Sequence, residues 1–127
     1  MKIIGIGLDL VSIPRMRAIT ERWRDQFLTR LFTEAERDYC LKRAAPYASL
    51  AARFAAKEAV LKALGTGWTG GIRWVDIQVV NDASGKPTAQ VSGRVKELMA
   101  GLGATRIHVS LAHEADYAIA EVMLTGD

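Results

Sequence analysis

Residues 47–67 read YASLAARFAAKEAVLKALGTG, a stretch rich in Ala, Leu, Lys and Glu and free of Pro. These are strong helix formers, and Gly65 stands where a helix of this kind stops. The sequence therefore predicts one long helix from Tyr47 to Leu64, around which the rest of the fold is arranged. At 100° per residue, one narrow stripe of this helix collects large apolar residues, namely Leu50, Phe54, Leu61 and Leu64.

The chain before this helix predicts one strand and two further helices. Residues 2–11, KIIGIGLDLV, are apolar and β-branched and indicate a buried strand. Ser12 and Pro14 suit the cap and the first turn of a helix continuing over 15–23. Thr33-Glu34-Ala35-Glu36 has the capping-box pattern, so a helix is expected from Glu34 to about Arg43, ending before Pro46.

The chain after the long helix indicates mostly strands. Its expected elements, in order, are strands at 73–81 and 88–92, a helix at 95–102, and strands at 106–112 and 117–124, the last two joined as a hairpin. Helices followed by an antiparallel sheet favour an α+β fold over a doubly wound one. The length of 127 residues suits a single domain.

Composition excludes several classes of protein. The chain is 50% hydrophobic and 24% charged, which is ordinary for a globular protein and unlike disordered, collagen-like or coiled-coil sequences. The lone Cys40 cannot form an internal disulfide, which removes the disulfide-rich secreted class. No apolar run is long enough for a signal peptide or a membrane span. We therefore expect a soluble, cytoplasmic protein.

Positive charge is concentrated early in the chain. Segment 14–30 holds five arginines against Glu21 and Asp25, and this excess equals the net charge of +3 of the whole chain. Such a patch attracts nucleic acid, an anionic lipid surface or an acidic protein. A solvated helix face is the equally simple alternative.

Two distant carboxylates and a lysine suggest a metal site. Asp9 is expected near the end of the first strand, and Glu58 at the edge of the apolar stripe of the long helix. If they converge near Lys62, two hard oxygen ligands would suit Mg²⁺ carrying substrate phosphates. The alternatives are that Asp9 caps the next segment and that Glu58 forms a surface ion pair with Lys62, four residues later.

Other chemically capable residues give weaker signals. Gly65-Thr66-Gly67 follows a helix instead of preceding one, so it is better interpreted as a helix stop than as a phosphate loop. His108 and His113 lack the spacing of a zinc site, and Cys40 has no evident activating base. Trp23, Trp68 and Trp74 are expected to pack instead of stacking on bases.

Four segments together resemble the holo-acyl-carrier-protein synthase family, the small bacterial 4′-phosphopantetheinyl transferases. They are residues 5–9 (GIGLD) with Arg15; 32–36 (FTEAE); 53–59 (RFAAKEA) with 62–67 (KALGTG); and 108–113 (HVSLAH) with 118–120 (AIA). They occur in the family's order and cover nearly the whole chain. Ala112 departs from the pattern, since the family often has a hydroxyl residue there.

The resemblance implies Mg²⁺-dependent transfer of 4′-phosphopantetheine from coenzyme A to a serine of an acyl carrier protein, in fatty acid biosynthesis. It implies an α+β fold in which an antiparallel sheet packs with a long helix and shorter helices, assembled as a homotrimer with active sites between subunits. Asp9 and Glu58 match the metal ligands, and Lys62 matches the lysine on the pyrophosphate.

The remaining matches concern coenzyme A and the carrier protein. Positions implied to lie along coenzyme A are Arg53, Gly65, Thr66, Gly67, Ser110 and His113, in addition to Lys62. The helix that docks the acidic carrier protein is matched by Arg15 and its neighbours, including Arg22 and Arg24. Glu58 is the candidate base that takes the proton of the serine.

Two other classes of function stay open from the residues alone. A nucleic-acid-binding module would use the same arginines with Trp23 and Trp68, and its affinity would fall steeply with salt. A non-catalytic assembly protein would treat Glu58 and Lys62 as a surface pair and would bind no metal. Neither class of function explains why the chain would combine Asp9, Glu58 and Lys62 in one site.

Overall fold

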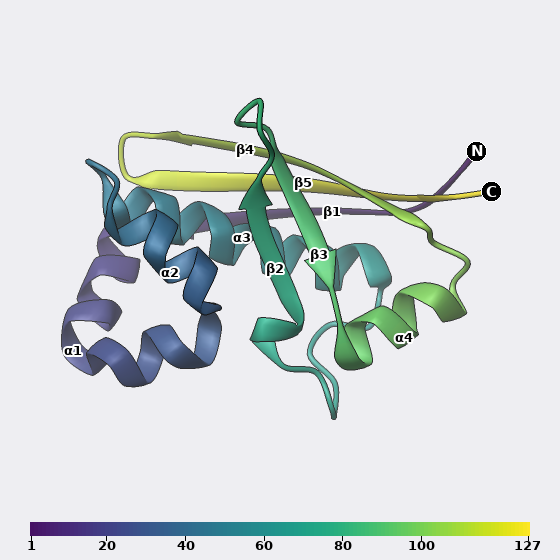
Figure 1. Ribbon diagram of the computed structural model, residues 1–127, viewed down its shortest axis with the longest axis horizontal. Helices are drawn as coiled ribbons and strands as arrows, with labels where there is room; N and C mark the ends of the chain where they lie inside the picture. The colour runs from purple at the N-terminus through teal and green to yellow at the C-terminus, as the bar shows by residue number, and fades with distance from the viewer.

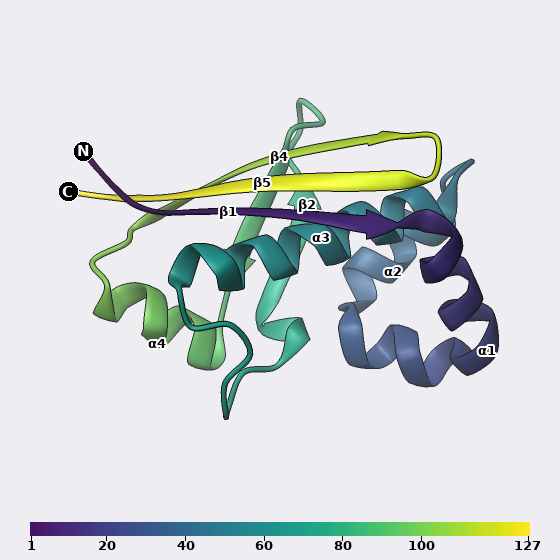
Figure 2. The same ribbon diagram turned by 180° about the vertical axis from the view of Figure 1, so that it is seen from behind.

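Strands β1 (Lys2–Ser12), β5 (Tyr117–Gly126) and β4 (Arg106–Glu114) form an antiparallel sheet in that order. The computed structural model describes residues 1–127, and its two termini lie together at one end of this sheet (Figure 1 and Figure 2). β4 and β5 form the predicted hairpin, in which Ala115 takes a positive φ of 53° at the turn. These strands extend slightly beyond the predicted bounds.

Helix α3 (Pro46–Leu64) packs along one face of this sheet. The approach is close because β1 carries glycines there: a Cβ on Gly5 or Gly7 would overlap the carbonyl of Ala63 or Ala59. The predicted helix is confirmed, and it ends at Gly65 in the left-handed conformation with φ 78°. The predicted single apolar stripe is too narrow, because most of the helix surface is buried.

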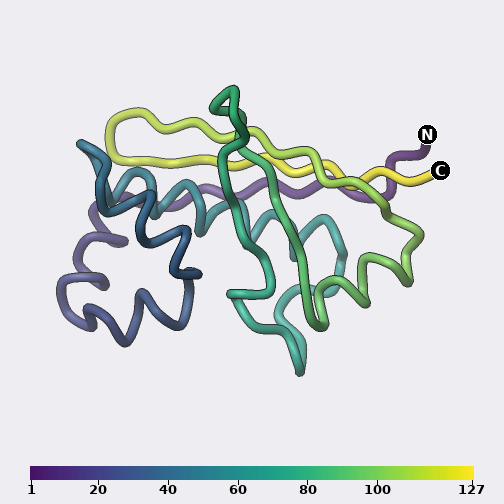
Figure 3. Tube along the Cα trace, in the orientation of Figure 1, coloured from purple at the N-terminus to yellow at the C-terminus, as the bar shows by residue number.

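A hairpin of β2 (Ile77–Asn81) and β3 (Pro87–Val91) packs against α3 on the side next to β4. Figure 3 shows this hairpin crossing the helix. Ile77 and Val79 join the main apolar core with residues of α3. The predicted strand over 73–81 is wrong at its start, because a short 3-10 helix (Trp74–Asp76) stands there. The 3-10 helix is stabilised by Asp76, whose carboxylate accepts a hydrogen bond from the backbone N–H of Arg73 at 3.1 Å.

The other helices flank the two ends of α3. Helices α1 (Ile13–Leu31) and α2 (Glu34–Leu41) form a second apolar cluster with the first half of α3, and α4 (Gly93–Gly101) lies at the opposite end of the molecule (Figure 1). The side chains of Ser12 and Thr33 cap α1 and α2 as predicted. α1 runs further than predicted and bends at Arg24, whose φ of 49° is left-handed. No helix combines the length and apolarity that a membrane span requires.

A buried ion pair joins α2, α3 and β2. Glu36 Oε1 accepts a hydrogen bond from Lys57 Nζ at 2.8 Å, and both side chains are fully buried. Glu36 also accepts the backbone N–H groups of Thr33 and Val79, while Lys57 donates to backbone carbonyls of the Trp74–Ile77 segment. Every charged atom therefore has a partner, which is what makes a buried pair tolerable.

Candidate functional site

Asp9 lies inside β1, with its side chain on the face that packs against α3. Gly5, Gly7 and Asp9 alternate along the strand, so they share this face. Asp9 was expected near the end of the strand, and β1 continues for three residues beyond it, to Ser12. The glycines let α3 approach closely, and Asp9 therefore meets the helix directly.

Lys62 of α3 forms an ion pair with Asp9. Its Nζ lies 3.0 Å from Asp9 Oδ1 and donates at 2.9 Å to the carbonyl of Leu8. The Asp9 side chain is 17% exposed, whereas that of Lys62 is 52% exposed. The alternative surface pair between Glu58 and Lys62 is absent from the ion pairs of the structure. The lysine thus contacts the strand and not the helix carboxylate one turn before it.

Glu58 lies in the same electrostatic environment. Partial burial raises the pKa of its carboxyl, the negative charge of Asp9 raises it further, and Lys62 acts in the opposite direction. Glu58 precedes Lys62 by one turn on α3, so both side chains lie on the part of the helix that faces Asp9. The structure therefore brings Asp9, Glu58 and Lys62 together. No third His, Cys, Asp or Glu joins them.

This donor set fits Mg²⁺ better than a structural metal. Mg²⁺ is commonly held by one or two carboxylates and completes its shell with water and phosphate oxygens. Two carboxylates at a partly open position provide that arrangement, whereas a structural zinc site needs four closed ligands. Lys62 adds a cation beside the position that a phosphate would take.

A cavity of about 570 Å³ lies between the end of α2, the start of α3, the β2–β3 hairpin and β4. Its lining includes four basic side chains and no carboxylate: Lys42, Arg43, Arg53 and His113. Asp9, Glu58 and Lys62 are not part of it. The predicted site residues therefore fall into two groups, a carboxylate pair with a lysine and a separate basic cavity.

Arg53 is the buried cation of this cavity and has no carboxylate partner. The residue is only 4% exposed, yet its guanidinium donates to two neutral oxygens, Ser49 Oγ at 3.1 Å and Asn81 Oδ1 at 2.6 Å. Its centre lies 4.3 Å from the ring centroid of Tyr39, and its Nε is buried without a partner. A buried, uncompensated cation is costly, so the cavity favours an anionic ligand.

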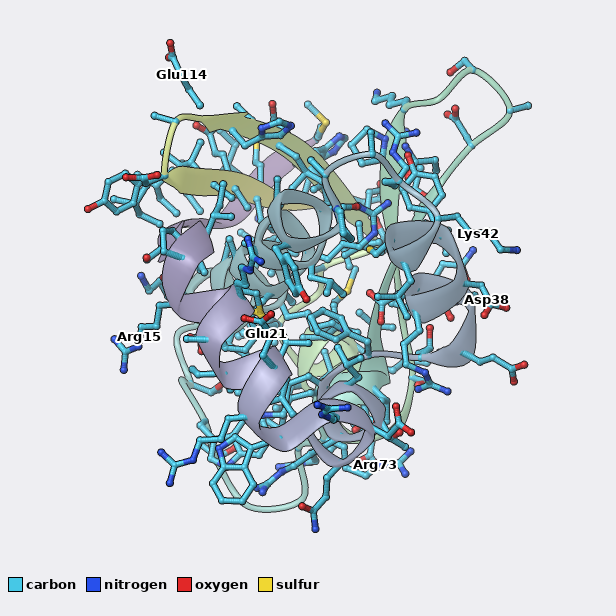
Figure 4. All side chains as sticks on the ribbon, turned by 90° about the vertical axis from the view of Figure 1, so that its left-hand side faces the viewer. Arg15, Glu21, Asp38, Lys42, Arg73 and Glu114 are labelled. Atoms are coloured by element: carbon cyan, nitrogen blue, oxygen red, sulfur yellow. The ribbon has the colours of Figure 1, made fainter.

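The sequence analysis did not predict the residues that α2 and the segment after it supply to this cavity. Tyr39, Lys42 and Arg43 come from the last turn of α2 and the residues after it, and Figure 4 shows Lys42 at that end of the helix. Arg43 also lies over the Tyr39 ring, at 5.1 Å from its centroid. The sequence contains one indication of anion binding here, the two consecutive basic residues Lys42 and Arg43 before Pro46.

Besides Lys62, four residues expected to contact coenzyme A lie outside this cavity: Ser110 and the loop of Gly65, Thr66 and Gly67. Ser110 is on the opposite face of the sheet, where it lines a separate cavity of about 370 Å³ with Glu121 and His108. The Gly65–Gly67 loop is a helix stop, as the residues predicted, and Gly65 donates to the carbonyls of Leu61 and Lys62. This loop lines neither the basic cavity nor the cavity beside Ser110.

The arginines of α1 lie on its exposed side. Figure 4 shows Arg15 extending from the helix into solvent, and Arg22 lies over the ring of Trp23 at 5.1 Å from its centroid. Trp23 is 52% exposed, so this surface is both basic and aromatic. Arg24 is exposed at the bend of the helix.

The sheet face that points away from α3 is uncovered, and along β1 it is apolar. Four large apolar side chains project from it and are exposed: Ile6, Leu8 and Leu10 on β1 and Ile119 on β5. Contiguous apolar surface of this kind is typical of a protein–protein interface.

Comparisons with known proteins agree along nearly the entire chain. A model of the 4′-phosphopantetheinyl transferase superfamily matches residues 5–122. The holo-[acyl-carrier-protein] synthase of Desulforudis audaxviator is 48% identical over 124 residues, which are 98% of this chain and 94% of that protein. The enzyme of the same name from Koribacter versatilis is 43% identical over 122 residues, 96% of this chain and 98% of the relative.

Solved structures give the same result. The holo-[acyl-carrier-protein] synthase of Neisseria meningitidis superposes with a TM-score of 0.88 at 33% identity and covers 98% of this chain and 99% of its own. The Helicobacter pylori synthase, solved in complex with coenzyme A, has a TM-score of 0.83 at 32% identity, with 94% of this chain and 99% of its own covered.

Proposed function

The chain belongs to the 4′-phosphopantetheinyl transferase superfamily, and we propose that it transfers 4′-phosphopantetheine from coenzyme A to a serine of an apo-acyl carrier protein, in fatty acid biosynthesis. Adenosine 3′,5′-bisphosphate would be the second product. The main support is the meeting of Asp9, Glu58 and Lys62 between β1 and α3. Relatives that carry the name of this activity, over nearly the full chain, support the same substrates.

Asp9 and Glu58 would hold the Mg²⁺ ion. When bound, the ion would supply charge neutralisation on the pyrophosphate of coenzyme A and polarise the phosphorus under attack. In phosphoryl-type transfer the protein positions groups and stabilises charge, and it needs no covalent chemistry of its own. A pair of carboxylates and a lysine is sufficient for that task.

The reaction forms one P–O bond and breaks another. The serine oxygen of the carrier attacks the phosphorus that bears the pantetheine, and the bond to the adenosine bisphosphate breaks. Glu58 accepts the serine proton, a role that suits a carboxyl whose pKa is raised by burial and by Asp9. Lys62 offsets the charge that develops on the leaving bisphosphate.

The basic cavity would hold the nucleotide end of coenzyme A. Arg53 and His113 line it, and Lys42 and Arg43 add positive charge at its mouth. The pyrophosphate is assigned to Lys62 and the carboxylate pair, which leaves the 3′-phosphate of the nucleotide for the buried Arg53. A phosphate there would compensate a cation that forms no ion pair within the chain.

A homotrimer with active sites between subunits would account for three further features. The outer face of the sheet exposes apolar side chains of β1 and β5 that a second copy would cover. Ser110 lies on that same face, so it would reach coenzyme A only from a neighbouring subunit. The Gly65–Gly67 loop, exposed at the end of α3, would contact the cofactor in the assembled protein.

The exposed arginines of α1 would dock the carrier protein. Acyl carrier proteins are typically acidic, and complementary charge raises the encounter rate and fixes orientation. Arg15, Arg22 and Arg24 all lie on exposed positions of this helix, with Trp23 among them.

One assay tests the proposal directly. The chain is incubated with apo-carrier protein, coenzyme A and Mg²⁺, and the carrier is then weighed by mass spectrometry. We expect a gain of one 4′-phosphopantetheine, and none with a carrier whose acceptor serine is replaced by alanine. A carrier of unchanged mass, at saturating coenzyme A and Mg²⁺, would rule out this activity.

A further inference from the structure

Asn81 is hydrogen-bonded on both sides of its amide. Its Oδ1 accepts the terminal guanidinium nitrogen of Arg53 at 2.6 Å, and its Nδ2 donates to the carbonyl of Gly85 at 2.8 Å. The guanidinium can only donate and the carbonyl can only accept, so the orientation of the amide is determined. Asn81 therefore links Arg53 of α3 to the turn of the β2–β3 hairpin.

That turn is itself held in one conformation. Asp82 Oδ1 accepts the backbone N–H groups of Ser84 at 2.9 Å and Lys86 at 3.0 Å, together with the Ser84 hydroxyl at 2.6 Å. The Gly85 carbonyl to which Asn81 donates is thus at a fixed position. Arg53 is consequently held from a rigid part of the hairpin, although the hairpin tip is exposed.

The groups that hold Arg53 leave its charge available. A guanidinium has five N–H donors. In the chain, only Ser49 and Asn81 accept from it, and both are neutral, while Tyr39 lies against its face. A carboxylate at either position would fix the side chain equally well but would neutralise it. Neutral acceptors fix the orientation of the guanidinium and keep its charge for a ligand.

We propose that Asn81 is a positioning residue that orients Arg53 toward the 3′-phosphate of the nucleotide in the basic cavity. The inference rests on the proposed function, since it takes coenzyme A as the ligand. Asn81 lines the same cavity, so its loss would let the guanidinium turn away from the bound anion. An orienting role of this kind concerns binding of the nucleotide and not the transfer step.

The test compares two nucleotides that differ by one phosphate. Adenosine 3′,5′-bisphosphate and adenosine 5′-monophosphate are titrated into the full chain by calorimetry, with wild type and Asn81→Ala. We expect Asn81→Ala to weaken binding of the bisphosphate about tenfold, as the loss of a hydrogen bond to a charged group would. Binding of the monophosphate should weaken less than about twofold. The matched control is Gln90→Ala, which removes an exposed hydrogen bond to Gln78 in the same hairpin and should change neither affinity.

A second variant separates orientation from structure. Asn81→Asp loses the hydrogen bond to the Gly85 carbonyl but keeps an acceptor for Arg53 and adds an ion pair with it, so it should remain folded at the assay temperature. It should nevertheless weaken binding of the bisphosphate at least about tenfold, because the guanidinium is neutralised. In steady-state transfer, both variants should raise KM for coenzyme A while kcat changes less than about twofold.

Several outcomes would overturn the proposal. One is that Asn81→Ala weakens binding of the two nucleotides equally. Another is that neither variant changes the affinity for the bisphosphate. The third is that the wild-type chain binds the bisphosphate no more tightly than the monophosphate. Failure of the proposed function gives a different result. In that case the bisphosphate still binds in an Asn81-dependent manner, but the carrier protein gains no mass.

Discussion

Lys62 Nζ lies 3.0 Å from Asp9 Oδ1, so the cation of α3 contacts the carboxylate that would also ligate the metal. Lysine and metal therefore compete for negative charge on Asp9. We expect Lys62→Gln to lower kcat at least about a hundredfold, because charge on the leaving bisphosphate is no longer offset. Its Mg²⁺ affinity should be equal to or tighter than that of the wild type, as measured by calorimetry.

Asp9→Ala is the matched comparison for Lys62→Gln. It should lose both turnover and Mg²⁺ binding, since it removes a ligand and not a competitor. Loss of Mg²⁺ binding in Lys62→Gln would contradict the roles given to the two residues.

Glu58 gives a prediction about pH. Burial and the neighbouring Asp9 raise its pKa, so the folded chain binds this proton more tightly than the unfolded chain does. The stability that the raised pKa contributes is complete below the unfolded value of about 4.3 and is lost as pH rises through the folded value. Without divalent ions, Glu58→Gln should therefore raise Tm near neutral pH, and the difference should disappear in acid.

Addition of Mg²⁺ should reverse the order of the melting temperatures of the wild type and Glu58→Gln. Ligand that binds only the native state stabilises it by mass action, so saturating Mg²⁺ should raise the Tm of the wild type and not that of Glu58→Gln. Thermal melts with and without Mg²⁺ measure both effects. An identical Mg²⁺ response in the two proteins would remove Glu58 from the metal site.

The buried pair of Glu36 and Lys57 gives a prediction about stability. Removal of one partner leaves the other charge buried and unpaired, which typically costs about 3–5 kcal/mol. We expect Glu36→Gln and Lys57→Met each to lower the free energy of unfolding by about that amount in urea denaturation. The control, Glu21→Gln, breaks the exposed pair with Arg17 and should leave stability nearly unchanged. A loss below about 1 kcal/mol at the buried pair would contradict the prediction.

Local signals in the sequence were sufficient for most of the secondary structure. Ser12 and Thr33 cap their helices as predicted, and Gly65 ends α3, because capping depends on a few adjacent residues. The start of the 73–81 strand was wrong because the carboxylate of Asp76 turns back onto Arg73, a contact that periodicity does not report.

Burial and the cavity were harder to predict because they depend on contacts between distant segments. Nothing local to Lys57 indicates burial, yet it is fully buried because Glu36, from another helix, accepts a hydrogen bond from its Nζ. The neighbourhood of Arg53 likewise depends on Asn81, 28 residues later in the chain. By contrast, the nearness of Asp9 and Lys62 agrees with the expected site, because the glycines of β1 bring α3 against that strand.

The apolar outer face of the sheet gives a prediction about assembly. Leu10 is 59% exposed there and is paired across the sheet with Ile119. A charge at this position would be buried without a partner in a trimer, so Leu10→Glu should dissociate the assembly and lower turnover at least about tenfold. Light scattering measures the mass. Leu102→Glu is the control, an exposed leucine after α4 that should leave a trimer intact, and a monomeric wild type would refute the assembly itself.

Arg15 gives the prediction about the carrier protein. It extends into solvent from α1, so charge reversal should not disturb the fold (Figure 4). We expect Arg15→Glu to raise KM for the carrier about tenfold at low salt, with KM for coenzyme A unchanged, because complementary charge steers the encounter. The difference should shrink at high salt, where surface charges are screened. Lys96→Glu makes the same change of charge on α4, at the far end of the molecule, and should leave both constants unchanged. Equal effects of the two variants would mean that net charge, and not the surface of α1, governs the encounter.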